Sequence, residues 1–253
     1  MKVTVLGCGG SLGVPMVGNN WGTCDPSNPK NRRRRPSILV EQGATTVLVD
    51  TSTDLRGQLL DARVERLDAV LYTHGHADHI HGIDDLRPMT WGRGPLAAYA
   101  DAATLDTLCR RFAYAVDNVE IDRGLYKPIL QVSTIDGPFH VGGMDIVPIV
   151  QDHGYSSSLG FRFGDFAYST DVVALDEAAF AALEGIRVWI VDATREEPHP
   201  THAHLDRALG WIERLKPERA YLTHMNHTMD YDRLMARLTP GVEPAYDGLV
   251  IEM

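Results

Sequence analysis

The feature that most constrains this chain is a dense group of polar residues at the end of a short apolar run. Residues Ala69–Tyr72 are apolar, and the next seven residues, Thr73 to His79, read Thr-His-Gly-His-Ala-Asp-His. A single histidine is usually solvated or part of a core, but three histidines and an aspartate within six positions need another explanation. Imidazole and carboxylate together suit zinc, manganese or iron. The motif therefore predicts a metal site at the end of a strand.

The same arrangement recurs at three more places. Apolar stretches deliver polar residues at Asp152-His153, at Asp171 and at His224. Independent polar residues at strand ends would explain one or two of these cases, but they explain four poorly. Apolar strands that end together at one edge hold a site on rigid supports. Six or seven such ligands can hold two ions, so we expect a two-metal centre and a hydrolytic enzyme.

The order of short elements indicates an α/β (α+β) fold in a single domain, 1–253. We expect strands at Val3–Leu6, Ser37–Glu41, Thr46–Val49, Ala69–Tyr72, Ile129–Ser133, Met144–Val150, Ser158–Phe163, Phe166–Ser169, Val188–Val191, Arg219–Thr223 and Gly248–Ile251. We expect helices at Ser52–Arg63, Ala102–Ala115, Asp176–Leu183, Leu205–Leu215 and Asp230–Leu238. The polar stretch Gly18–Pro36 is expected to be a long surface loop.

Composition limits the partners of such an enzyme. The 253 residues are 44% hydrophobic, which is ordinary for a globular core, and carry a net charge of −10. This charge disfavours long nucleic acid held by a broad basic face, but a local patch can still bind a small phosphorylated substrate. Three widely spaced cysteines form no disulfide framework. Without a signal peptide or an 18-residue apolar run, we expect no membrane partner and a cytoplasmic location. A homodimer is left open.

At these residues the chain resembles the metallo-β-lactamase superfamily, whose pattern is H-x-H-x-D-H followed by a distant His, Asp and His. The resemblance implies a four-layer αββα sandwich with the metals at one edge. It implies two divalent ions, zinc or manganese with iron as a further option. In it, His74, His76 and His153 would hold the first ion, Asp171 would bridge, and Asp78, which also orients the attacking hydroxide, would hold the second with His79 and His224.

Two further features resemble the phosphodiesterase branch, which includes the tRNA 3′-processing endonucleases and the PhnP-type cyclic phosphodiesterases. One is the opening Leu6–Pro15, and the other is His204 just ahead of an Ala-containing helix. The resemblance implies a metal-dependent phosphodiesterase that uses a hydroxide activated by two metals, acts on a small, cyclic phosphodiester and has His204 as general acid, with His202 as the alternative position. The run Arg32–Arg35 offers phosphate capture, although charged runs on loops are mostly solvated.

Three other functions stay open. The same site would serve hydrolysis of a thioester, a lactone or another carbonyl substrate. A tRNA 3′-processing endonuclease is less favoured, because no basic insertion suggests a tRNA-gripping arm. A non-hydrolytic di-iron module is disfavoured by the missing four-cysteine site.

The chain also departs from the PhnP-like pattern. There a Cys-x-Cys-x-x-Cys run and a later histidine hold a structural zinc, but here only Cys24 and His227 remain. One thiolate and one imidazole cannot close a four-coordinate shell, so we expect no tightly held third metal. We expect the Trp21 ring to pack the loop instead. His227 would then be free for the substrate pocket or have no role.

Overall fold

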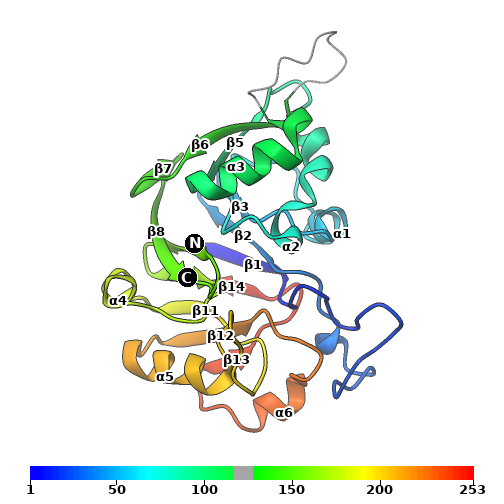
Figure 1. Cartoon of the computed structure of the whole chain (residues 1–253), viewed down its shortest axis with the longest axis vertical. Helices are drawn as coiled ribbons and strands as arrows, with labels where there is room; N and C mark the ends of the chain where they lie inside the picture. The colour runs from blue at the N-terminus through cyan, green and yellow to red at the C-terminus, as the bar shows by residue number, and fades with distance from the viewer. Residues whose placement is uncertain (117–127) are drawn as a thin grey trace.

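The computed structural model describes residues 1–116 and 128–253, and its strands form two sheets that lie face to face (Figure 1). The first sheet has the order β14-β1-β2-β3-β4-β5-β6. Its strands are β1 (Lys2–Gly7), β2 (Ser37–Gln42), β3 (Thr45–Val49), β4 (Ala69–Leu71), β5 (Leu96–Ala100), β6 (Leu130–Thr134) and β14 (Val250–Glu252). The second sheet has the order β13-β12-β11-β10-β9-β8-β7. Its strands are β7 (Phe139–Val141), β8 (Met144–Asp152), β9 (Ser157–Phe163), β10 (Phe166–Ser169), β11 (Val188–Asp192), β12 (Arg219–Thr223) and β13 (Val242–Pro244).

The first sheet is buried on both faces. In β3 the side chains of Val47 and Val49 belong to the core between the sheets, whereas Leu48 belongs to a second core on the outer face. Successive side chains of a strand point to opposite faces, so an apolar strand of this kind joins two cores. This explains why the strands that lead to the site read as continuous apolar runs instead of alternating ones.

Helices cover the outer faces, as the α/β sandwich expectation requires. The helices α1 (Leu55–Asp61), α2 (Ala77–Ile80) and α3 (Ala102–Arg111) contribute buried side chains to the outer core of the first sheet, beside a 3₁₀ segment, Ile83–Thr90. The helices α4 (Glu177–Leu183), α5 (Leu205–Leu215) and α6 (Tyr231–Met235) pack with the second sheet (Figure 1). The four-layer αββα architecture is therefore confirmed. No helix in the described ranges is long and apolar enough to cross a membrane.

Some elements differ from the sequence expectation. Strands β5, β7 and β13 were not expected: β5 reads Leu-Ala-Ala-Tyr-Ala, with three alanines, and β13 ends in Pro244 at the edge of its sheet. Alanine and proline have low strand propensity, so β5 and β13 form strands because they pair with neighbouring strands of the sheet. Gly248 lies outside β14, with a φ of 87°, and α6 stops at Met235.

The strand directions bring the expected site residues to one edge. Strands β3, β4, β5 and β6 run parallel, as do β10, β11, β12 and β13. Strand β9 is antiparallel to both β8 and β10, so β8 ends on the same side as β10. Residues that follow β4, β8, β10 and β12 are consequently neighbours in space, which is where parallel sheets commonly place their sites.

Candidate metal centre

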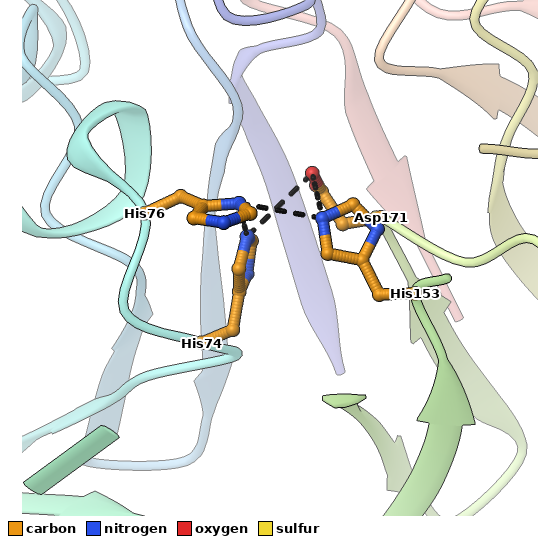
Figure 2. Close-up of side chains that lie close together, drawn as sticks. All are labelled: His74, His76, His153 and Asp171. Carbon is orange, nitrogen blue, oxygen red and sulfur yellow. Dashed lines mark hydrogen bonds and ion pairs between the residues drawn. The ribbon is translucent and has the colours of Figure 1, made fainter. Parts of the chain in front are cut away.

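The structure brings all seven expected ligand residues together in two groups. The first group comprises His74, His76, His153 and Asp171 (Figure 2). His74 Nε2 lies 2.8 Å from His76 Nδ1, and His153 Nε2 lies 3.3 Å from the same atom. Both Nε2 atoms are 3.7 Å from Asp171 Oδ1. His76 is exposed whereas the other three are buried, so the centre opens toward solvent on the His76 side.

The second group comprises Asp78, His79 and His224, and it lies on the other side of Asp171. Asp171 Oδ2 is 3.1 Å from His79 Nε2 and 3.4 Å from His224 Nε2. Asp78 Oδ2 completes this group, at 3.4 Å from His79 Nε2 and 3.6 Å from His224 Nε2. Asp78 and His79 lie in the first turn of α2, which starts right after His76. The motif thus divides at the start of α2. His74 and His76, before the helix, belong to the first group, and Asp78 and His79, inside it, belong to the second.

Asp171 stands between the groups because one carboxylate oxygen faces each of them. Burial raises its pKa, but the imidazoles of His224, His79 and His74 outweigh this effect and hold the pKa well below its usual range. The backbone at Asp171 is left-handed, with a φ of 53°, and His224 has a φ of 58°. Non-glycine residues rarely adopt this region, and the strain they carry tends to gather at functional sites.

Two outer partners orient the histidines. Asp50, which follows β3, accepts hydrogen bonds from the Thr73 amide at 2.8 Å and from His79 Nδ1 at 2.7 Å. The carbonyl oxygen of Thr201 accepts from His153 Nδ1 at 2.7 Å. Such partners fix which imidazole nitrogen is free to face an ion. Asp50 was not expected from the sequence, although it is a polar residue directly after an apolar strand, like the candidate ligands themselves.

The structure separates the two candidate acids. His202 Nε2 lies 3.9 Å from Asp171 Oδ1, and its Nδ1 lies 2.9 Å from Asp192 Oδ2, at the end of β11. Burial lowers the pKa of His202, but Asp192 first and then Asp171 and Asp78 raise it to about 9. His204 instead occupies the N-cap position of α5, and its buried Nδ1 has no hydrogen-bond partner within residues 1–116 and 128–253. Among the described residues, His202 lines the first cavity, whereas His204 belongs neither to that lining nor to the candidate ligand groups.

The donor set fits two divalent ions. The buried His79 Nε2 and His224 Nε2 have no hydrogen-bond partner among the described residues, although each faces two carboxylates. A tetrahedral ion with ligands about 2.0–2.2 Å away would hold those ligands roughly 3.3–3.6 Å apart. The gaps from Asp171 to His74, His153, His79 and His224 are 3.1–3.7 Å. Nitrogen donors on both sides of a shared carboxylate match what zinc, manganese or iron require.

Two cavities meet at the centre. The first, of about 270 Å³, is lined by members of both ligand groups and is bordered by Tyr155, Ser156 and Thr201. The second, of about 210 Å³, lies beside it, and both are lined by Ser11, His202 and His224. Gly10 lines the second cavity, and a Cβ at this position would lie 3.3 Å from the His224 carbonyl oxygen and 3.5 Å from its ring. The glycine turn after β1 therefore packs against a candidate ligand.

The arginine run does not line either cavity. Arg34 contacts Asp61, and Arg35 Nη1 pairs with Asp54 at 3.1 Å. Arg33 is buried and donates to the carbonyl oxygen of Asn226 at 3.3 Å. These side chains brace the loop, so the structure gives no support to phosphate capture by this run.

A family model described as a β-lactamase superfamily domain matches residues 45–225. A crystal structure described as a new diphosphatase from the PhnP family superposes with a TM-score of 0.92 at 35% identity, and the match covers 100% of this chain and 96% of that one. Human tRNase Z, short form, at 17% identity and a TM-score of 0.72, shares the fold.

Two curated relatives carry other names. An octanoyltransferase of Porphyromonas gingivalis is 32% identical over 98% of this chain, and the match spans 51% of that protein. A ribonuclease Z of a Bradyrhizobium species is 34% identical over 34% of this chain and 31% of its own length. Nearly the whole chain thus corresponds to about half of the first protein. Only 34% of the chain matches the second protein.

Proposed function

This chain belongs to the β-lactamase superfamily, and from that premise we propose that it is a two-metal phosphodiesterase acting on a small phosphodiester. The single observation that carries the proposal is the position of Asp171, whose two oxygens each face one group of donors. A carboxylate between two imidazole groups suits a shared bridge better than it suits a lone ion. The chain is a metallo-β-lactamase-fold hydrolase, and the phosphodiester is our extension of that assignment.

We assign His74, His76 and His153 to the first ion, and Asp78, His79 and His224 to the second, with Asp171 shared. Two divalent ions lower the pKa of water between them and balance charge on both sides of an in-line displacement. Asp78 would orient the nucleophile from the side facing His224. The exposed edge of His76 leaves room for the substrate to enter.

His202 is the side chain we assign as general acid, in place of His204. Its Nδ1 is held by Asp192, so its Nε2 can present a proton toward the centre. A proton at that atom would go to the leaving alcohol oxygen as the phosphorus–oxygen bond breaks. General acid help of this kind is typically worth about 10²–10⁴ in rate.

Carbonyl hydrolysis is the competing activity. The name octanoyltransferase of the Porphyromonas gingivalis relative points to acyl chemistry, although this chain matches only 51% of that protein. The name diphosphatase, carried by a solved structure that matches this chain over 100% of its length, points to phosphorus chemistry. We favour the second, because that likeness covers nearly all of both chains.

The test is an assay of the purified protein loaded in turn with zinc, manganese or iron. The panel holds bis(p-nitrophenyl) phosphate, a cyclic nucleotide, a ribose cyclic phosphate, an octanoyl thioester and a lactone. Asp171→Ala serves as the blank for contaminating activity. We expect turnover of phosphodiesters that the blank lacks. Turnover confined to the thioester and the lactone would refute the proposal.

A further inference from the structure

The second cavity lies beside the candidate metal centre. Of its described lining residues, His224 alone is one of the seven candidate ligands assigned to the two ions. His202 lines both cavities, but its ring nitrogens face the carboxylates of Asp192, at 2.9 Å, and Asp171, at 3.9 Å. What the second cavity binds is therefore decided by its other lining residues, which the proposed function leaves without a role.

Three side chains of this cavity carry hydrogen-bond donors that no described residue accepts. Asn226 Oδ1 accepts from the Thr228 amide at 2.8 Å, which fixes the side-chain amide and leaves its Nδ2 hydrogens unpaired. His199 Nδ1 accepts from the Thr201 amide at 3.3 Å, so the proton of the neutral ring is on the unpaired Nε2. Thr194 is only 6% exposed, and its hydroxyl is unpaired as well. Polar groups this close to the interior usually have partners, so these donors indicate a ligand that accepts hydrogen bonds.

A buried cation acts on the same wall without lining the cavity. Arg33 is 2% exposed, its Nε has no hydrogen-bond partner in the described ranges, and it forms no salt bridge with a described carboxylate. Its Nη1 donates to the Asn226 carbonyl oxygen at 3.3 Å. The N–H of that trans peptide belongs to His227, points away from the carbonyl oxygen and has no acceptor among the described residues. The guanidinium thus polarises a peptide whose free N–H belongs to a lining residue.

The cavity offers few acceptors in return. No aspartate or glutamate is among the described residues that line it. The carbonyl oxygens of Thr194, Asn226 and His227 already accept hydrogen bonds. Leu12 and Met16 add apolar surface, which suits the carbon chain of a ligand. Unpaired donors, with a buried positive charge next to them, favour an oxyanion over a cation.

We propose that the second cavity binds a second phosphoryl group, which the substrate carries in addition to the phosphodiester at the metal centre. The oxygens of this group would accept from the unpaired donors of Thr194, His199 and Asn226 and from the His227 amide. Neutral side chains and backbone amides can hold such an anion without a lysine or arginine in direct contact. The inference rests on the proposed function for the group at the centre, and it adds that the preferred diester has a phosphate monoester at one end.

The test is calorimetric binding of phosphonates to the metal-loaded protein, because their carbon–phosphorus bonds resist hydrolysis. Propylphosphonate and 3-hydroxypropylphosphonate carry an uncharged arm. Propane-1,3-bisphosphonate and pentane-1,5-bisphosphonate carry a second anionic group at two distances. A hydrogen bond to a charged group is worth roughly tenfold to a hundredfold in affinity. At least one bisphosphonate should therefore bind about tenfold or more tightly than both ligands with uncharged arms.

The variants locate the effect through the ratio of bisphosphonate affinity to propylphosphonate affinity. Asn226→Asp keeps an oxygen for the Thr228 amide and puts a carboxylate in place of the unpaired Nδ2, so the ratio should fall to about one. Thr194→Val removes a hydroxyl at similar volume and should lower the ratio roughly threefold to tenfold. Val17→Asp is the matched control, because it adds the same charge at a side chain that is 97% exposed and does not line the cavity. There the ratio should change by less than about twofold.

Equal affinity for the bisphosphonates and the ligands with uncharged arms, including no binding of any, would overturn the inference. So would a bisphosphonate gain that survives in Asn226→Asp, because the ions and not the cavity would then bind the second phosphonate. An equal effect of Val17→Asp and Asn226→Asp would overturn it too. The two proposals fail separately. A gain that depends on Asn226, without turnover of any phosphodiester, would refute the proposed function alone, whereas turnover without this gain would refute the second phosphoryl site alone.

Discussion

The substitution Asp192→Asn should move the high-pH limb of the kcat–pH profile to lower pH. Asp192 is fully buried, and its Oδ2 accepts from His202 Nδ1 at 2.9 Å and from the Val172 amide at 3.0 Å. In Asp192→Asn the amide oxygen can take the place of Oδ2 and accept both hydrogen bonds, so the substitution removes charge with little change in shape. The other carboxylate oxygen of Asp192 has no hydrogen-bond partner in the described part of the chain.

The expected magnitude follows from what holds the proton on His202. Burial lowers its pKa, and Asp192 makes the largest of the contributions that raise it to about 9. Without that charge the pKa should fall by about 1–2 units, or roughly 1.4–2.7 kcal/mol. A raised histidine pKa keeps the acid form below that pKa and loses it as the pH rises through it. At pH 8 the protonated fraction, and with it kcat, should therefore fall about twofold to tenfold.

The assay is kcat against pH for both proteins with one metal and one diester. Bound divalent ions lower the His202 pKa in both proteins. The quantity to compare is therefore the difference in apparent pKa between the high-pH limb of the unaltered protein and that of Asp192→Asn. Asp145→Asn is the matched control, since Asp145 pairs with His140 on the surface, away from the centre. A limb that stays in place in Asp192→Asn while metal content is unchanged would show that His202 is not the titrating acid.

Three further outcomes are expected. Asp171→Ala should lower the metal content below two ions per chain and abolish turnover, and two retained ions with a near-normal rate would point to another bridge. Asp50→Asn should weaken binding of the ion that His79 faces by about 10–100-fold, measured by chelator competition, and leave the first ion in place. Metal analysis after dialysis should give close to two ions per chain and no third, chelator-resistant zinc, and a zinc lost on Cys24→Ser would contradict this.

The surroundings of Cys24 are held by contacts within the chain. Cys24 is buried, its Sγ lies 3.9 Å from Arg33 Nη1, and a Cβ on Gly22 would overlap the His227 ring at 2.2 Å. The loop is fastened to the chain before α6 by Asn31, whose amide donates to Asp230 Oδ2 at 2.7 Å. This hydrogen bond joins the loop to the start of α6, and the expectation of no third metal stays a prediction. Trp21 stays half-buried, under the Arg32 guanidinium.

The sequence identified the candidate ligands because their signal is local. A strand-forming run followed by histidine or aspartate can be recognised from neighbouring residues, and the seven candidate positions that the structure brings together were found in this way. Asp50 and Asp192 follow strands by the same rule, yet nothing local says that β3 and β11 end beside the centre. The sequence could not decide between His202 and His204 as general acid, because both residues precede the same helix. The folded structure shows that the His202 ring lies near Asp171, whereas His204 is the N-cap of α5.

The sequence by itself therefore determined the chemistry of the donors, the strands that carry them and the fold class. The tertiary structure alone decided the division into two groups around Asp171, the hydrogen-bond partners of the imidazoles, and the second cavity beside the centre. The physical reason is distance along the chain. Residues as far apart as Gly10 and His224 meet through the order and direction of strands in two sheets, which depend on packing across the whole core and not on any one segment.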